Sequence, residues 1–283
     1  YEHVYGESRY AGTFQVTGQG AKRLFRQGQP KSIVDIAALT SIYRPGPLAA
    51  NVDKLYIKAK NDPSSVTYEH PILEDILNET FGLVVFQEQT LKIANKLGGL
   101  PPADCDRFRK VIMKREVSTL GKNQAEIDDL KARFLAGAIE RGMTKHAADE
   151  LFQKLSYFSG YGFCSAHALS YAIDSYYCAW LLTHYEPEWL CSYIESQIGN
   201  PEKRANAMSE LQSFGYEVAQ VDINLATDRW RAVQGKRLIP SFQTIKGLGM
   251  TTVEEILTER PYHSIEDFLW HEDGTWRHKK LTK

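Results

Sequence analysis

The chain has 283 residues, of which 24% are charged and 43% are hydrophobic, with 20 Gly and 11 Pro. These values are typical of a folded globular protein with one large domain or two, and they exclude a disordered, collagenous or fibrous chain. The net charge of −1 argues against a uniformly basic nucleic-acid binder but is compatible with local basic patches.

The first 31 residues are rich in Gly and Gln and show no helical periodicity until about Gly20. A short helix is predicted from Ile33 and must end before Pro45. Arg44-Pro45-Gly46-Pro47 then predicts a stiff, non-helical corner, because proline fixes φ and Gly permits unusual turns. Phe81–Phe86 predicts a short buried strand or an apolar lead into the helix that follows.

Beyond Pro101-Pro102 the pattern predicts a run of helices over residues 104–115, 124–141, 144–158 and 166–185. Gly142 is placed to end the second of these helices, and Thr144 to cap the third. The last of them is apolar or small nearly all round, which predicts a position at the centre of the core.

A boundary is predicted near Gly199-Asn200-Pro201. After it we expect a helix to about Phe214, strand-like residues at 216–221 and 230–239, and a helix after Gly249. The fold class predicted is mainly α: a helical domain, a small α/β segment and a final turn-and-helix unit.

The four cysteines include no C-x-x-C pair, which indicates reduced thiols in a cytoplasmic protein rather than a zinc ribbon or a disulfide framework. No signal peptide or membrane span is predicted. The most apolar long segment, residues 166–185, carries His167, Asp174 and His184, which a bilayer would have to desolvate. The absence of an initiator Met and of a closing signal predicts a fragment of a longer protein.

Three clusters of cations stand out. They are Lys22, Arg23, Arg26 and Lys31 within ten residues without an acid; Arg107, Arg109, Lys110, Lys114 and Arg115 within nine residues; and Arg277, Lys279, Lys280 and Lys283 at the end. A charge run is most often a solvated face, so a single cluster is weak support for phosphate binding.

Asp104-Cys105-Asp106 is the only D-x-D pattern in the chain. Paired carboxylates can hold two Mg²⁺ ions for phosphoryl transfer, but these two are predicted at a helix start, where Asp caps the helix and the side chains diverge. No metal site is therefore predicted. His167 follows a glycine-rich loop, and a core or capping role is its simplest interpretation. Neither Cys164 nor Ser165 is predicted as a nucleophile.

Ile245-Lys246-Gly247-Leu248-Gly249 has the form of a helix-hairpin-helix turn. Glycines allow a phosphate to approach the backbone, and the N–H groups at the start of the next helix can bind it. Two glycines in a turn are also ordinary, so DNA-backbone binding and plain turn formation both remain open here.

Eight stretches, in order, resemble the alpha subunit of bacterial DNA polymerase III, the C-family replicative polymerases, over nearly the whole chain. They are Gly12-Thr13-Phe14-Gln15; Ile42 through Leu48, which contains the Arg-Pro-Gly-Pro corner; Phe81 through Gln89; Asp106 through Lys110; Gly160-Tyr161-Gly162-Phe163 with His167; Trp180-Leu181 with His184-Tyr185-Glu186-Pro187; Asp222-Ile223-Asn224; and Ile245 through Gly249.

The resemblance implies a palm-edge connector at 1–31, a helical fingers domain at 32–200 and a truncated helix-hairpin-helix DNA-binding region at 201–283. The catalytic carboxylates of the family, with their Mg²⁺, would lie upstream of this stretch, so no catalytic residue is predicted here. The fragment would position the incoming deoxynucleoside triphosphate and grip primer-template DNA. In the parent protein, a sliding clamp and other replisome subunits are the expected partners.

By the same resemblance, the predicted nucleotide-binding residues are Arg109, Lys110, Lys114, Arg115 and His167. The predicted DNA-binding residues are Arg44, Lys246, Gly247 and Gly249. Ser165 stands where the family has Lys, which leaves that phosphate contact in doubt and is typical of a divergent, phage-encoded or accessory member.

Two other classes of function stay open: a non-catalytic DNA-binding scaffold, and a helix-hairpin-helix repair protein such as a glycosylase. A glycosylase needs a catalytic Asp after the hairpin. Asp267 is the candidate, although its surroundings read as a surface helix.

Overall fold

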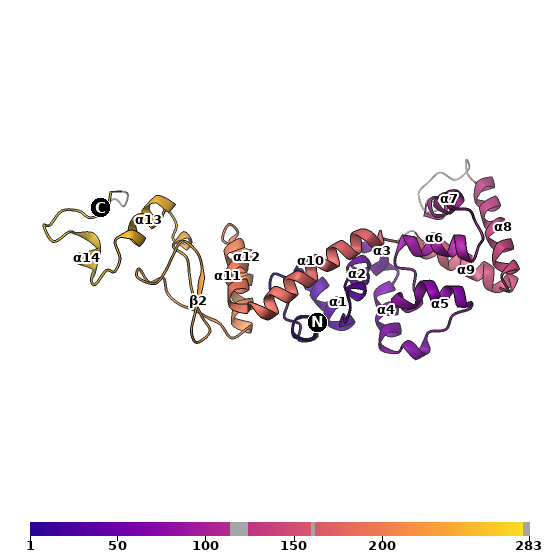
Figure 1. Ribbon diagram of the computed structural model, residues 1–283, viewed down its shortest axis with the longest axis horizontal. Coiled ribbons are helices and arrows are strands. Elements are labelled where there is room, and N and C mark those ends of the chain that lie inside the picture. The colour runs from indigo at the N-terminus through magenta and orange to yellow at the C-terminus, as the bar shows by residue number, and fades with distance from the viewer. Residues whose placement is uncertain (114–123, 160–161, 280–283) are drawn as a thin grey trace. The chain divides into compact units, whose positions relative to one another are not determined.

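The computed structural model describes residues 1–113, 124–159 and 162–279 (Figure 1). Most of these residues are helical, and three short strands form one small sheet, which confirms the mainly α class. No helix within the described ranges combines the length and apolar character needed to cross a bilayer.

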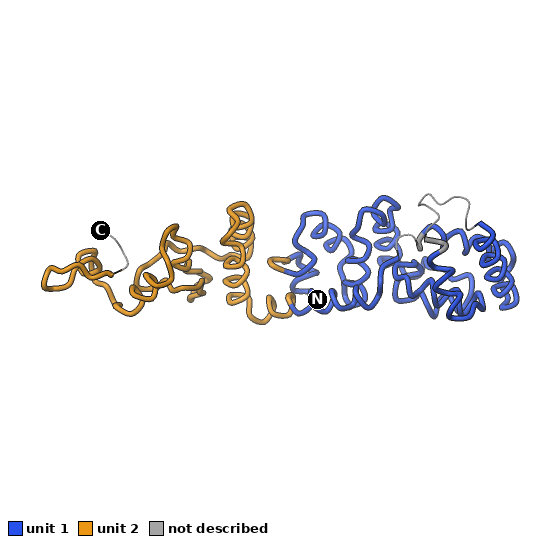
Figure 2. The backbone as a smooth tube through the Cα atoms, turned by 90° about the horizontal axis from the view of Figure 1, so that it is seen from above, with its two compact units in different colours: residues 1–8, 13–177 blue, residues 9–12, 178–283 orange. Residues whose placement is uncertain are grey.

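The chain divides into two compact units (Figure 2). Unit 1 comprises residues 1–8 and 13–177, and unit 2 comprises residues 9–12 and 178–283. The division falls within helix α10 (Ser165–His184). The assignment of residues 1–31, 32–200 and 201–283 to functional regions stays a prediction.

Unit 1 begins with a short π-helix (Glu2–Gly6), followed by α1 (Gln19–Gly28), α2 (Ile33–Ile42), α3 (Pro45–Ala49) and α4 (Val52–Asn61). The helix predicted from Ile33 is confirmed, because Ser32 Oγ accepts a hydrogen bond from Asp35 N at 3.0 Å and caps it. Asp35 is buried and accepts hydrogen bonds from Tyr56 Oη at 3.0 Å and Lys60 Nζ at 2.7 Å. These bonds join α2 to α4.

The prediction of a non-helical corner at Arg44-Pro45-Gly46-Pro47 is wrong. Residues 45–49 form α3, and Arg44 precedes it in an extended conformation with φ −144° and ψ 155°. Both prolines lie in the first turn, where a backbone N–H has no partner within the helix, so the missing N–H groups lose nothing. The extended residue before the first proline follows the ordinary steric rule.

Five helices of unit 1 surround one apolar core (Figure 1): α5 (Pro71–Leu77), α6 (Gln87–Lys96), α7 (Pro102–Met113), α8 (Gln124–Glu140) and α9 (Lys145–Ser159). Phe108, Phe134 and Phe152 meet in it, with ring centroids 5.2 to 6.1 Å apart. Two one-turn 3₁₀ helices, Pro63–Ser65 and Asn78–Thr80, link the helices before α6.

The predicted helix ends in this region are confirmed. Gly142 follows α8 with φ +101°, the left-handed conformation that glycine adopts without strain. Thr144 Oγ1 accepts a hydrogen bond from Ala147 N at 3.2 Å and caps α9. Local capping chemistry therefore sets both boundaries.

The prediction that residues 166–185 form a central core helix is wrong in its burial. The helix forms as α10, but its buried positions follow a single stripe: Ala168, Ala172, Ser175, Ala179 and Leu182. Ile173, Tyr177 and Trp180 are 41%, 60% and 42% exposed. Small residues on one face let neighbouring backbone approach closely, and only that face is covered, although several large apolar side chains lie on the other faces.

Unit 2 contains α11 (Glu186–Ser196), α12 (Pro201–Ser213), α13 (Met250–Thr258) and α14 (Ile265–Leu269). Its sheet has the order β1 (Glu217–Val218), β3 (Arg237–Ile239), β2 (Arg231–Val233), parallel between β1 and β3 and antiparallel between β3 and β2. Strand structure is confirmed in both predicted segments: 216–221 contains only the short β1, and 230–239 is two strands, β2 and β3, separated by a turn rather than one strand. A small core of buried residues joins the sheet to α13: Ala226, Ile239, Phe242, Val253, Ile256 and Tyr262.

Candidate functional site

The turn before α6 is held by one buried amide. Gln89 Oε1 accepts hydrogen bonds from Val85 N and Phe86 N, both at 2.9 Å, and Gln89 Nε2 donates to Thr80 Oγ1 at 2.7 Å. Gln89 is 6% exposed, so these groups have no access to water as an alternative partner. The side chain fixes the path of the backbone into α6.

Phe163 pairs with this turn across a long sequence separation. Gln87 N donates to Phe163 O at 3.0 Å, and Phe163 N donates to Val85 O at 3.1 Å. Of the two alternatives predicted for Phe81–Phe86, the strand is reduced to one bridge between Phe86 and Phe163, and the segment leads into α6 at Gln87. A Cβ on Gly162 would lie 3.2 Å from Gln87 Cα, so glycine permits this close approach. We call this contact the Gln87–Phe163 junction.

Glu88 of α6 binds a backbone N–H group at the amino end of α10. Glu88 Oε2 accepts a hydrogen bond from Ser165 N at 2.9 Å. Burial works to raise the pKa of Glu88, but hydrogen bonds from the Ser165 backbone and side chain and from Cys164 leave that pKa below its usual value. Ser165 is thus engaged by a carboxylate of this chain.

Three residues predicted from the sequence converge on the Gln87–Phe163 junction. Arg109 Nη1 donates to Gln87 Oε1 at 3.2 Å. The Arg44 guanidinium lies 4.6 Å from the centroid of the Phe163 ring, and the exposed His167 ring lies 5.3 Å from the same centroid. Arg109 and His167 were predicted to bind nucleotide and Arg44 to bind DNA, and the fold brings all three to one place.

Asp106 links the two adjacent cations of α7. Arg109 Nη2 lies 2.9 Å from Asp106 Oδ1, and Lys110 Nζ lies 2.6 Å from Asp106 Oδ2. Hydrogen bonds from Lys110 and then Arg109 lower the pKa of Asp106. Lys114 and Arg115, the other two cations predicted for nucleotide binding, lie outside the described residues.

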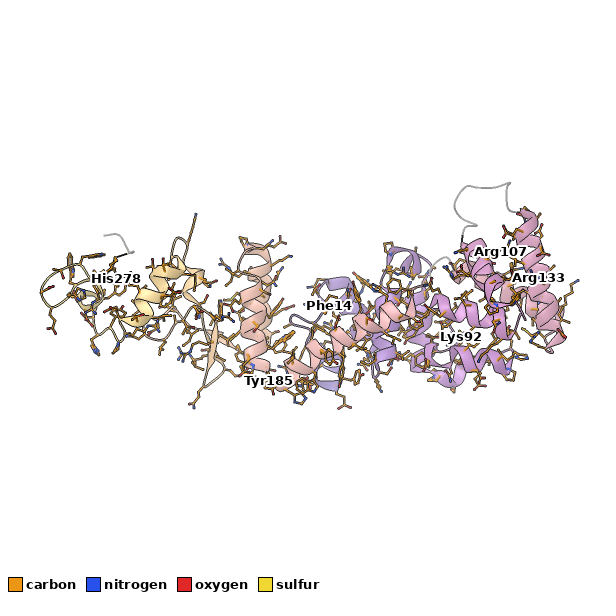
Figure 3. All side chains as sticks on the ribbon, turned by 45° about the horizontal axis from the view of Figure 1, so that its top comes forward. Phe14, Lys92, Arg107, Arg133, Tyr185 and His278 are labelled. Atoms are coloured by element: carbon orange, nitrogen blue, oxygen red, sulfur yellow. The ribbon has the colours of Figure 1, made fainter. Side chains whose placement is uncertain are left out.

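Asp104 and Asp106 do not fit a metal site. Asp104 binds Arg133 Nη2 at 2.5 Å and lies 3.5 Å from Arg107 Nη1. Arg107 and Arg133 lie near each other on α7 and α8 in Figure 3. Each carboxylate thus faces its own pair of cations, and within the described ranges no three His, Cys, Asp or Glu side chains gather as metal ligands do.

The second predicted site, the hairpin at Ile245–Gly249, lies in unit 2. Gly247 has φ +88° and Gly249 is the residue before α13, with open space where a Cβ would stand on either glycine. Lys246 is exposed beside them. The element before the turn is a single 3₁₀ turn, Phe242–Thr244, rather than an α-helix. The turn therefore presents glycine backbone and one ammonium group to solvent.

Asp267 is engaged in local structure. Its Oδ2 accepts a hydrogen bond from His263 N at 2.8 Å, and its Oδ1 binds Arg277 Nη2 at 2.9 Å. It lies in the first turn of α14, which Ser264 caps. These contacts confirm the helical reading of this segment and occupy both oxygens that a catalytic Asp would need.

Comparison with known proteins identifies both parts of the chain. Residues 3–142 match the family described as the bacterial DNA polymerase III alpha subunit finger domain, and residues 215–282 match a helix-hairpin-helix motif family.

Three curated relatives carry the name DNA polymerase III subunit alpha. The protein of Borreliella burgdorferi is 33% identical over 99% of this chain and 24% of its own length. Those of Treponema pallidum and Aquifex aeolicus are 30% and 31% identical, over 97% and 93% of this chain and 23% and 22% of their own lengths. The chain spans about a quarter of the length of the curated relatives it matches.

Proposed function

Since the chain belongs to the family of bacterial DNA polymerase III alpha subunits, we propose that it forms the fingers and the start of the helix-hairpin-helix region of a DNA-directed DNA polymerase. Its role is to position the incoming deoxynucleoside triphosphate and to hold primer-template DNA. The observation that carries the proposal is the convergence of Arg44, Arg109 and His167 on the Gln87–Phe163 junction.

Arg109 and Lys110 supply the charge that a triphosphate requires. In template-directed synthesis the primer 3′-hydroxyl attacks the α-phosphate and pyrophosphate leaves, so negative charge develops on the leaving oxygens. Positioned cations stabilise that charge. Asp106 holds both cations in place without nucleotide, and a triphosphate would replace this carboxylate as their partner. The adjacent Lys114 and Arg115 belong to the same proposed phosphate-binding segment.

Arg44 and His167 flank Phe163 on the same junction. Burial lowers the pKa of Arg44, yet a guanidinium remains charged at neutral pH. The junction thus places one guanidinium and one imidazole beside an aromatic side chain. We assign His167 to the nucleotide and Arg44 to the DNA backbone, as the family resemblance implies.

Mg²⁺ would be held by palm carboxylates that are not among these residues, since the D-x-D pair is occupied by cations. When bound there, the ions would stabilise the attacking and leaving oxygens. Primer-template DNA, deoxynucleoside triphosphates, a sliding clamp and other replisome subunits are the proposed partners, in the cytoplasm. The Gly247–Gly249 turn with Lys246 would contact duplex phosphate without reading bases.

The decisive experiment compares two arginines on α7 in the full-length polymerase. Arg109→Ala should reduce kcat/KM for nucleotide by roughly 10- to 150-fold, about 1.5–3 kcal/mol, the range of a charged hydrogen bond. Arg107→Ala is the matched control, because Arg107 is 60% exposed and pairs with Asp104 and Glu126 away from the junction. Steady-state primer extension with varied nucleotide measures both.

Equal kinetics in Arg109→Ala and wild type would remove Arg109 from the nucleotide site. A full-length protein that binds primed DNA but never extends it would favour a non-catalytic scaffold. Release of a free base from damaged duplex would favour the repair alternative.

A further inference from the structure

Helix α1 has a cationic face that the proposed function leaves unused. Ala21, Leu24, Phe25 and Gly28 are buried against unit 1, and the opposite side is made of polar residues only. These are Gln19, Lys22, Arg23, Arg26 and Gln27, which follow the i, i+3, i+4, i+7, i+8 spacing of one helix face. We call this set the α1 face.

The charges of the α1 face are not offset by acids of its own helix. The sequence contains no Asp or Glu from residue 8 to residue 34. Among the described residues, no ion pair joins Arg23 or Arg26 to a carboxylate; Arg26 Nε donates to Ser8 Oγ at 3.2 Å. By contrast, Arg107 on α7 and Arg133 on α8 are ion-paired.

This arrangement lowers the stability of the free helix. Arg23 and Arg26 are three residues apart, a spacing at which like charges repel. An anion bound across the α1 face would relieve that repulsion. Charge crowding on a folded helix is therefore better explained by a polyanionic ligand than by solvation alone.

The shape and composition of the α1 face indicate which kind of ligand it can bind. It is a convex stripe about 10 Å long from Gln19 to Arg26, not a pocket that could enclose a small phosphate compound. It presents no aromatic or aliphatic anchor of the kind that dominates protein interfaces. The apolar side of α1 is buried in the fold and cannot enter a membrane. Arginine, lysine and glutamine are the side chains that contact phosphate and sugar in nucleic acids.

We propose that the α1 face binds the phosphate backbone of DNA, independently of base sequence, as a contact separate from the Gln87–Phe163 junction and the Ile245–Gly249 turn. The inference rests on the proposed function, because it takes DNA as the polyanion that this protein meets. Duplex and single-stranded template share the required chemistry, and the test separates them.

The test measures the salt dependence of DNA binding by the full-length protein, with Arg23→Gln/Arg26→Gln against wild type. Each lost phosphate contact makes the log–log salt slope shallower by about 0.9 for duplex and about 0.7 for single strands. The double variant should therefore make the slope shallower by about 1.8 if the α1 face binds duplex DNA, and by about 1.4 if it binds the single-stranded template. Blunt duplex and primed template with a long overhang are the two probes.

The matched control is Lys92→Gln/Lys96→Gln on α6. These two exposed lysines also lie on one helix of unit 1, four residues apart where the two arginines are three apart, and the variant removes the same net charge. Lys92 is labelled in Figure 3. The control should leave the slope unchanged. Both double variants should have a melting temperature no lower than that of wild type. If Arg23→Gln/Arg26→Gln melts at a lower temperature, the single change Arg23→Gln replaces it, with half the expected change in slope.

An unchanged slope in Arg23→Gln/Arg26→Gln overturns the proposal, and so does an equal change in the control, which would report net charge alone. Unaltered DNA binding with lost binding of an acidic protein would also overturn it in favour of a protein partner. Binding does not need catalysis, so the two proposals fail separately. Normal extension with an unchanged slope defeats only the α1 face, whereas a changed slope in a protein that never extends primers defeats only the polymerase function.

Discussion

The Gln87–Phe163 junction and the Ile245–Gly249 turn are built in opposite ways. The junction collects side chains from the residue before α3, from α6, from α7 and from the amino end of α10, and it depends on buried hydrogen bonds such as those of Gln89. The turn is made by one local segment, with Gly247 at φ +88° and no tertiary partner at its Cβ position. Substitutions in the junction should therefore lower both the stability of the fold and the rate of nucleotide incorporation, whereas substitutions in the turn should lower only the affinity for DNA.

Gln89→Leu tests the dependence of the junction on its buried amide. The substitution leaves Val85 N and Phe86 N without an acceptor inside the protein. Each unsatisfied buried group costs about 1–3 kcal/mol, so the free energy of unfolding should fall by about 2–6 kcal/mol. Urea denaturation monitored by circular dichroism measures it.

Gln124→Leu is the control, because the exposed Gln124 amide bonds only to Asp128 on its own helix. A change within about 0.5 kcal/mol is expected there. If the two glutamines behave alike, the buried amide does not hold the junction.

Glu88→Gln tests the carboxylate that closes α10. The variant keeps an acceptor for Ser165 N but loses the charge at the helix amino end, and stability at pH 7 should fall by about 1 kcal/mol. The folded-state pKa of Glu88 lies below its unfolded value, so the carboxylate stabilises the fold above the unfolded pKa. That contribution is lost as the pH falls through the lower, folded-state pKa.

The difference between Glu88→Gln and wild type should therefore begin to shrink below the ordinary glutamate pKa of about 4.3 and vanish below the folded-state pKa of Glu88. Thermal denaturation from pH 7 down to pH 3 follows it. Glu140→Gln is the control, since Glu140 lies at the carboxyl end of α8 and is 81% exposed. A Glu88 effect that persists unchanged at pH 3 would rule out the charge as its cause.

Gly247→Val tests the turn. Valine at φ +88° is strained and places a branched side chain where phosphate should approach. Duplex affinity of the full-length protein should fall by about 3- to 10-fold, about 1 kcal/mol, and equally for unrelated sequences. Gly199→Val, in open space without a positive φ, should bind normally. A loss that depends on base sequence would contradict backbone recognition.

The same contrast explains what the sequence could predict. Helix ends at Gly142 and Thr144 and the glycine turn at 247–249 follow from local chemistry, and all three form as predicted. Pro45 and Pro47 misled the prediction because position in the first helical turn, not residue type, decides whether proline is tolerated.

Tertiary features could not be predicted in this way. The composition of α10 predicted a position at the centre of the core. Burial depends, however, on which elements pack against the helix, and only its small-residue face is covered. The roles of Gln87, Glu88 and Asp106 were missed because each acts on a partner that its local pattern does not mark. A long-range pairing such as Phe86 with Phe163 leaves no periodic signal.

The smallest expected effect concerns the 283-residue chain by itself in a primer-extension assay with Mg²⁺ and all four nucleotides. Its basic clusters should neutralise about three to five phosphates, giving weak duplex binding with a log–log salt slope of about −3 to −4.5. Extension should be nil, because Mg²⁺ catalysis needs carboxylates free to take ions, and Asp104 and Asp106 are each bound by two cations. Extension that disappears in Asp104→Ala or Asp106→Ala would show that these carboxylates exchange their arginine and lysine partners for metal. Extension that survives both changes would place the metal ligands elsewhere in the chain, and the assignment of the catalytic carboxylates to the palm would be wrong.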